Sequence, residues 1–208
     1  SGLAIDVVNL LLAIPSIPEA DADRVGMWGH SMGGAVTIKV LTILGENPNI
    51  QQPERGGAQS KPVGLRAAVL YSTVSADDAD IINRWGMGCF GDIAAGEQVL
   101  GCNSADVIPI DLPLDLQNAY RLTASDGEAL KKVAAFYHLD YVNAPVQIHY
   151  GTEDGKFLSG TPPEWSLKLT QELRDAGKIW IISCVGLFHY FIYIFCFGKT
   201  NRILKTLE

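Results

Sequence analysis

Four runs of apolar and β-branched residues recur along the chain, and each has the length of a strand. They cover residues 24–28, 65–71, 145–150 and 178–185. Their apolar positions are nearly continuous rather than alternating, which is typical of strands buried in a parallel sheet. Helical patterns separate them. The chain therefore predicts an α/β fold, with a mostly parallel sheet covered by helices on both faces.

Three segments carry apolar residues at helical spacing. The first covers residues 3–14, and two prolines follow it. The second, VTIKVLTILGENPN, is expected to stop at Gly45. The third, PPEWSLKLTQELRDAGK, is expected to begin near Pro163 and to end at Gly177, just before the fourth strand. These helices would connect and flank the strands.

The connection between the second and third strands is too long for an ordinary crossover. It contains a stretch punctuated by Gly and Pro, and then a capping box at Ser125 and Glu128 before an apolar helical face. We therefore expect a single domain, residues 1–208, with a lid insertion over about residues 77–143.

Composition excludes several classes of function. The 208 residues are 48% hydrophobic, with a net charge of -7 and no Lys/Arg cluster, so no nucleic-acid partner is expected. The four cysteines form no C-x-x-C pair and have no His cluster beside them, so neither a metal nor a cofactor is expected. Cys89 and Cys102 flank a Gly-rich segment and could pair in an oxidising compartment.

Two apolar segments bear on the cell compartment. No basic region precedes the first segment, residues 3–14, so this segment does not have the pattern of a signal peptide. Residues 179–197 carry no formal charge and approach the length of a membrane span, but Gly186 and His189 divide them into pieces that suit a buried strand or a core helix. The acidic pI and the few cysteines favour a cytoplasmic protein over a secreted one.

The segment VGMWGHSMGG places Ser31 between a strand pattern and a helical pattern. A G-x-S-x-G sequence after a strand forms a sharp turn that exposes the serine hydroxyl, with small residues at Gly29, Gly33 and Gly34 admitting a close approach of strand and helix. The backbone N–H of Met32 would then face a developing oxyanion. Ser31 is a candidate nucleophile, and the alternative is an ordinary turn serine.

A nucleophilic serine needs a base and an acid that orients the base. Asp154 follows the third strand and His189 follows the fourth, in the chain order acid and then histidine. Glu153 is the alternative acid if Asp154 only forms a turn. Three other histidines suit the role of base less well: His30 is inside the serine turn, His149 is in a strand and His138 is in the lid helix.

Three motifs, VGMWGHSMGG, VQIHYGTEDGKF and GLFHYF, resemble the α/β-hydrolases, closest to the prolyl-oligopeptidase-like and esterase branch. The resemblance implies a serine hydrolase with the triad Ser31, Asp154 and His189 and with Met32 in the oxyanion hole. We further expect substrate contacts from His30, Tyr71 and Trp85.

Nothing in the sequence marks a pocket for a charged substrate, so the resemblance favours a carboxylesterase that acts on small acyl esters. The alternatives are a prolyl-oligopeptidase-like peptidase and a non-catalytic binding module. In this family further strands precede the serine turn, which leaves the first strand here at an open edge. An apolar strand edge needs cover. We therefore expect a homo-oligomer that buries this edge, or the helix over residues 3–14, against a second copy.

Overall fold

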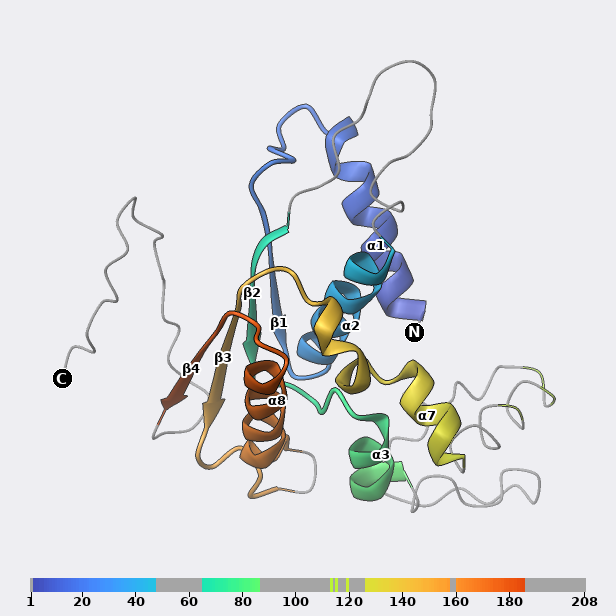
Figure 1. Ribbon diagram of the computed structural model, residues 1–208, viewed down its shortest axis with the longest axis vertical. Coiled ribbons are helices and arrows are strands. Elements are labelled where there is room, and N and C mark those ends of the chain that lie inside the picture. The colour runs from blue at the N-terminus through green and yellow to red at the C-terminus, as the bar shows by residue number, and fades with distance from the viewer. Residues whose placement is uncertain are drawn as a thin grey trace.

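The computed structural model describes residues 2–47, 65–86, 126–157 and 160–185, together with residues 113, 115 and 119. Four parallel strands form one sheet in the order β1-β2-β3-β4 (Figure 1). They are β1 (Val25–His30), β2 (Leu65–Tyr71), β3 (Val146–Gly151) and β4 (Trp180–Val185). The α/β class and the parallel sheet are therefore confirmed, and the strand with the serine turn lies at a sheet edge.

The helices agree with the sequence patterns in position. The longer ones are α1 (Gly2–Ala13), α2 (Met32–Glu46) and α8 (Pro163–Asp175), and the shorter elements are η1 (Ile14–Ser16), α3 (Asp78–Ile81), η3 (Ile82–Gly86), α7 (Gly127–Val133) and η5 (Ala135–Tyr141). Gly177 ends α8 with a φ of 67°.

Two of the expected helix boundaries are wrong. Gly45 does not stop α2 but lies inside it, where a Cβ would stand 1.7 Å from the carbonyl oxygen of Tyr141. The cap of α7 is Asp126, whose carboxylate accepts from the backbone N–H groups of Glu128 and Ala129. The glycine thus serves a close approach to η5, and the aspartate replaces the expected serine cap.

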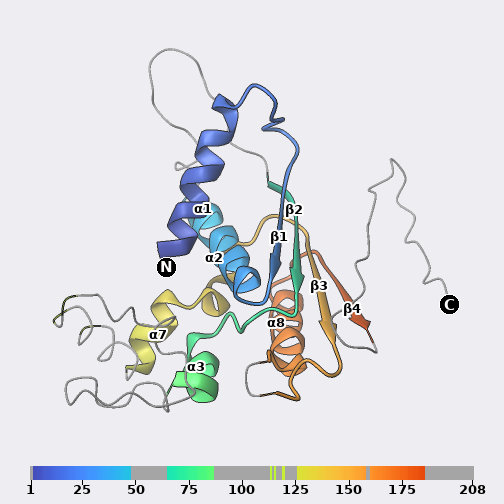
Figure 2. The same cartoon turned by 180° about the vertical axis from the view of Figure 1, so that it is seen from behind.

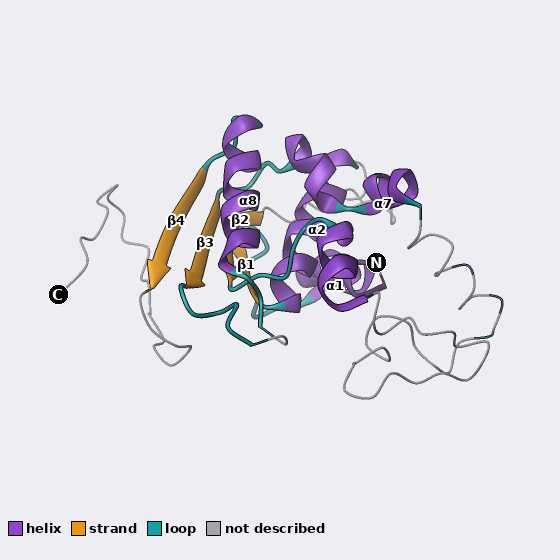
Figure 3. Cartoon of the chain, turned by 90° about the horizontal axis from the view of Figure 1, so that it is seen from below, coloured by secondary structure: helices purple, strands orange, loops and turns teal. Residues whose placement is uncertain are grey.

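The two long helices that pack against the sheet in the described part of the chain, α2 and α8, lie on one face of it. Figure 3 shows α2 and α8 on the same side of the strands. Ala68 and Leu70 of β2 and their register partners Val146 and Ile148 of β3 share one buried apolar cluster with residues of both helices. The strand order explains this, because right-handed crossovers that all step in one direction place every connecting helix on the same face.

A second apolar cluster joins α1 to α2 rather than to the sheet. It contains Ala4, Val8 and Leu11 of α1 and Val40 and Leu44 of α2. Figure 2 shows α1 lying along the outer side of α2. The rest of the α1 surface exposes apolar side chains: Leu3, Ile5 and Leu10.

The predicted lid is described in part, over residues 77–86 and 126–143. Its last segment belongs to the body of the domain, because Ala135, Leu139 and Val142 are buried in the main core with α2 and α8. The lid role of the remaining residues stays a prediction. Cys89, Cys102 and residues 186–208, with His189 among them, lie outside the described residues. No described helix has both the length and the apolar character to cross a membrane.

Candidate active site

Ser31 occupies a strained turn between β1 and α2. Its backbone has φ 54° and ψ -120°, a conformation that costs a residue with a side chain about 1–3 kcal/mol. The turn is held from two directions: its N–H donates to the carbonyl of Tyr71 at 3.0 Å, and its carbonyl accepts from Val74 and Gly34 at 3.0 Å each. The end of β2 therefore enforces the conformation.

Small residues make room for the turn. A Cβ on Gly29 would lie 2.2 Å from the carbonyl oxygen of Gly33, and one on Gly34 would lie 2.4 Å from Oγ1 of Thr73. A Cβ on Gly33 would meet nothing within 4 Å. The steric requirement thus falls on Gly29 and Gly34, and the expected requirement at Gly33 is wrong.

The Ser31 side chain does not act as a helix cap. A serine at the start of a helix ordinarily accepts a hydrogen bond from the first turn, but Ser31 makes no such bond to α2. Met32 is the first residue of α2, where N–H groups have no acceptor within the helix and carry partial positive charge. The Ser31 hydroxyl and the Met32 N–H therefore both belong to the start of this helix.

Asp154 lies just after β3 and is buried, with 6% of its surface exposed. Its Oδ2 accepts from the backbone N–H of Gly151 at 2.8 Å and from the hydroxyl of Ser72. Glu153 instead forms an ion pair with Lys156. The geometry favours Asp154 over Glu153 as the acid, since Asp154 is buried and held by Gly151 and Ser72, whereas Glu153 is paired with Lys156.

Ser72 is a site residue that sequence reasoning missed. It follows β2 directly, has a φ of 44° and is 2% exposed. Its N–H donates to the carbonyl of His149 at 2.8 Å, and its carbonyl accepts from Thr161 Oγ1 at 2.9 Å. The sequence shows only a serine after an apolar run, and such a serine is usually a simple turn residue.

The end of β2 joins the two candidate catalytic residues. Tyr71 accepts from the N–H of Ser31, and the next residue, Ser72, donates to Asp154. Strands β1, β2 and β3 are parallel, so their carboxyl ends lie at the same end of the sheet. Ligands of open α/β sheets bind at this end. The structure thus brings Ser31 and Asp154 to the carboxyl end of the sheet. His189 remains a prediction.

The three expected substrate contacts divide into two groups. His30 is the last residue of β1 and is paired in register with Tyr71, with ring centroids 5.7 Å apart. Trp85 belongs to η3 and packs edge-on against Trp165 at 5.1 Å. The first two lie beside the serine turn, whereas Trp85 joins a separate aromatic cluster. Whether any of them contacts a substrate stays a prediction.

The other histidines have surroundings of their own. His149 is buried in β3 with its ring stacked on Tyr71, and burial lowers its pKa. His138 lies in η5, with Nε2 3.1 Å from the carbonyl oxygen of Lys132.

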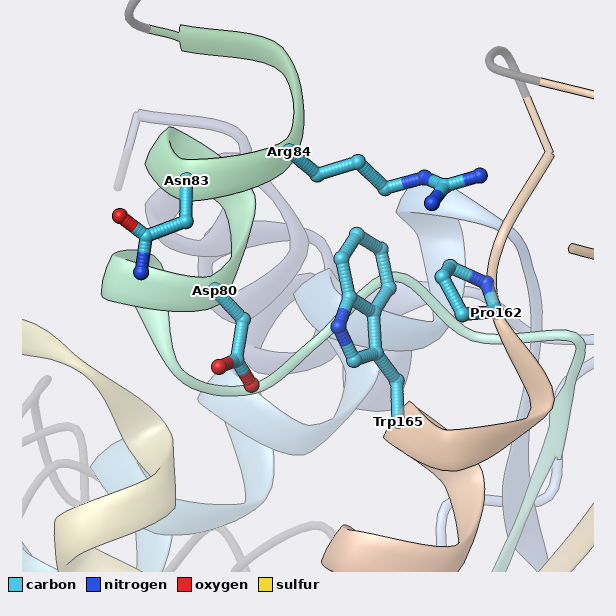
Figure 4. Close-up of a pocket in the computed structure, with 5 residues that line it drawn as sticks. All are labelled: Asp80, Asn83, Arg84, Pro162 and Trp165. Atoms are coloured by element: carbon cyan, nitrogen blue, oxygen red, sulfur yellow. The ribbon is translucent and has the colours of Figure 1, made fainter.

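A hollow of about 380 Å³ lies between η3 and the start of α8 (Figure 4). Its lining residues are Asp80, Asn83, Arg84, Pro162 and Trp165. Trp165, rather than Trp85, is the tryptophan that lines it. Across the described part of the chain, His, Cys, Asp and Glu side chains form no group of three or more that could hold a metal ion.

Comparison with solved structures identifies the fold. Pyrococcus horikoshii acylaminoacyl peptidase is similar with a TM-score of 0.51 and 19% identity, over 87% of this chain and 22% of that one. A Mycobacterium tuberculosis puromycin-hydrolyzing peptidase has a TM-score of 0.52 and 16% identity, over 88% and 21%. Porphyromonas gingivalis dipeptidyl peptidase 4 has a TM-score of 0.52 and 16% identity, over 88% and 18%.

No protein-family model matches the chain, and no curated protein matches it by sequence. The chain spans about a fifth of the length of these three structures. The parallel sheet with its flanking helices is a partial α/β-hydrolase fold.

Proposed function

We propose that the protein is a serine hydrolase that works by acyl transfer, with Ser31 as its nucleophile. The observation that carries the proposal is the backbone of Ser31: a positive φ at a strand-to-helix turn, with no capping role for the hydroxyl. Strain of this kind persists only where the surroundings enforce it, and it is concentrated at functional sites. The hydrogen bond that the Ser31 N–H donates to Tyr71, and those that its carbonyl accepts from Val74 and Gly34, supply that enforcement.

The proposed reaction has two steps. The Ser31 oxygen attacks a carbonyl carbon while its proton passes to the imidazole of His189, and the imidazole then protonates the leaving group. The N–H of Met32 donates to the oxyanion, and Asp154 orients and stabilises the imidazolium. Water then attacks the acyl-enzyme by the same route, which releases the acid and restores the Ser31 hydroxyl.

The substrate class has two candidates. Esters of small acyl groups are the first, because an alcohol leaves more readily than an amine and depends less on protonation by the imidazole. Peptides are the second, because the three similar structures reported above are named peptidases. Both classes pass through an acyl-enzyme on Ser31, so the nucleophile is common to the two.

The test is release of chromophore from nitrophenyl acetate or butyrate, compared with release of nitroaniline from aminoacyl nitroanilides. The proposal expects a burst equal to the protein concentration that disappears in Ser31→Ala. Ser16→Ala is the matched control, because the Ser16 hydroxyl is exposed and bonds only to Ala13 in its own turn. Turnover that survives in Ser31→Ala would contradict the proposal, and no turnover of either class would favour a binding module.

A further inference from the structure

Arg84 reaches from η3 to the loop that carries Asp154 and donates to three backbone carbonyls there. Its Nε lies 3.1 Å from the carbonyl oxygen of Gly160, and its Nη2 lies 3.0 Å from that of Phe157 and 3.4 Å from that of Gly155. Figure 4 shows the side chain extended past Trp165 toward the segment with Pro162. One guanidinium thus binds the carbonyls of Gly155, Phe157 and Gly160 together.

Two aromatic rings hold the guanidinium in place. The Arg84 Cζ lies 5.9 Å from the ring centroid of Trp165 and 6.0 Å from that of Trp85. The planar guanidinium suits this setting, because it stacks on aromatic rings and presents its donors in a fixed fork. A lysine would supply the charge but neither the fork nor the stacking.

The element that carries Arg84 is itself anchored to the body. Asp77 and Asp80, next to and within α3, both accept from Nζ of Lys168 on α8, at 2.8 and 2.9 Å. Burial alone would lower the pKa of Lys168, but these two carboxylates outweigh burial and raise it. Lys168 therefore stays charged, and the base of η3 is fixed to α8.

The loop that Arg84 holds has little room to change shape. A Cβ on Gly160 would lie 2.0 Å from the carbonyl oxygen of Asp154. The next residue, Thr161, donates to the carbonyl of Ser72, whose hydroxyl in turn bonds to the Asp154 carboxylate. A shift of Gly160 or Thr161 would thus be passed directly to Asp154.

We infer that Arg84 is a positioning residue for Asp154: it fixes the backbone of Gly155, Phe157 and Gly160 and so holds the carboxylate at Ser72. The catalytic part of this inference rests on the proposed hydrolase function, whereas the structural part does not. Because Arg84 acts on the acid rather than on the substrate, its loss should lower kcat and leave KM nearly unchanged. A displacement of about 1 Å can cost about 100-fold in rate.

The experiment compares Arg84→Gln and Arg84→Lys with Arg66→Gln. Arg66 is the matched control, because it also donates to a backbone carbonyl, that of Asp23, at the amino ends of β1 and β2. The first readout is hydrogen exchange at the amides of Asp154, Lys156 and Gly160, which bond within the loop. We expect exchange at least about tenfold faster in both Arg84 variants, as the loss of about 1.4 kcal/mol of hydrogen bonding implies, with β3 unchanged.

The second readout is the steady-state kinetics of each variant. We expect kcat to fall roughly 10- to 100-fold in Arg84→Gln, with KM within about threefold and Arg66→Gln like the wild type. Unchanged loop exchange in both Arg84 variants would overturn the inference, as would faster exchange with an unchanged kcat. A wild-type protein without Ser31-dependent activity would instead refute the proposed function, and loop exchange would still decide whether Arg84 holds the turn.

Discussion

The Ser72 hydroxyl donates a hydrogen bond to Oδ2 of Asp154, 82 residues further along the chain. Ser72 directly follows Tyr71, whose carbonyl accepts the N–H of Ser31. The end of β2 therefore contacts both the candidate nucleophile and the candidate acid. This arrangement makes the turn after β2 the structural centre of the site.

Ser72→Ala and Ser72→Gly should both lower kcat, because each removes the donor from a buried carboxylate. The expected loss is about 10- to 100-fold, from about 1–3 kcal/mol for an unsatisfied buried group. Their stabilities should differ, because glycine adopts the φ of 44° without strain and alanine does not. Kinetics and thermal unfolding of both variants check this, and full activity in Ser72→Gly would show that the donor is not needed.

Gly34→Ala should destabilise the protein, because the added Cβ would lie 2.4 Å from Oγ1 and 3.1 Å from Cα of Thr73. Overpacking of this kind costs about 1–3 kcal/mol. Gly33→Ala is the matched control one residue away, where a Cβ meets open space and alanine favours the helix. Denaturant unfolding of the two variants should give opposite signs. Equal destabilisation would contradict the packing described at the serine turn.

His149 should make the fold less stable in weak acid. Burial lowers its pKa below the ordinary value of about 6.5, so the unfolded chain binds the proton more readily than the folded one. Stability should therefore be full above about pH 6.5 and should decline as the pH falls from there toward the folded pKa. The His149 ring stacks on the ring of Tyr71, and the Tyr71 ring also contacts that of His30.

The measurement is urea unfolding of His149→Gln and of the control His138→Gln between weakly acidic and neutral pH. The His149 variant should lose part of the decline in stability on acidification, and the His138 variant should keep it. If His149→Gln retained the whole decline, the acid sensitivity would have another source.

The protein should self-associate through the edge strand β1 or through the exposed apolar side chains of α1. Trp28 on β1 is 67% exposed, and Leu10 on α1 is 59% exposed. Light scattering should report a dimer or larger at micromolar concentration, and Trp28→Glu or Leu10→Glu should shift it toward monomer. Val133→Glu on α7 is the control, since Val133 is also an exposed apolar residue. A wild-type monomer at this concentration would contradict the prediction.

The elements of this fold that could be predicted from the sequence are those with strong local patterns. The four strands, α8 and the turn at Ser31 are specified by residues adjacent in the chain, as is the place of Asp154 after β3. Helix coverage of the sheet could not be predicted, because it depends on strand order, which no local pattern records.

The missed residues owe their roles to contacts between distant segments. Ser72 meets Asp154 across 82 residues, and Arg84 meets Phe157 across 73. Neither residue belongs to a motif: a serine directly after a strand is ordinarily a turn residue, and an arginine in an insertion is ordinarily a surface group. Gly33 was misassigned because the crowding at the turn falls on Gly29, from the Gly33 carbonyl, and on Gly34, from the distant Thr73, whereas a Cβ on Gly33 itself would meet open space.

The role of Ser31 is tested most directly by covalent labelling with a fluorophosphonate, followed by peptide mass spectrometry. The probe reacts with an activated serine, so the label should appear on the peptide with Ser31 and should vanish in Ser31→Ala. It should persist in Ser16→Ala and fall in Asp154→Asn, because the acid orients the base. Labelling of another residue, or no labelling of the folded wild-type protein, would contradict the assignment of Ser31 as the nucleophile.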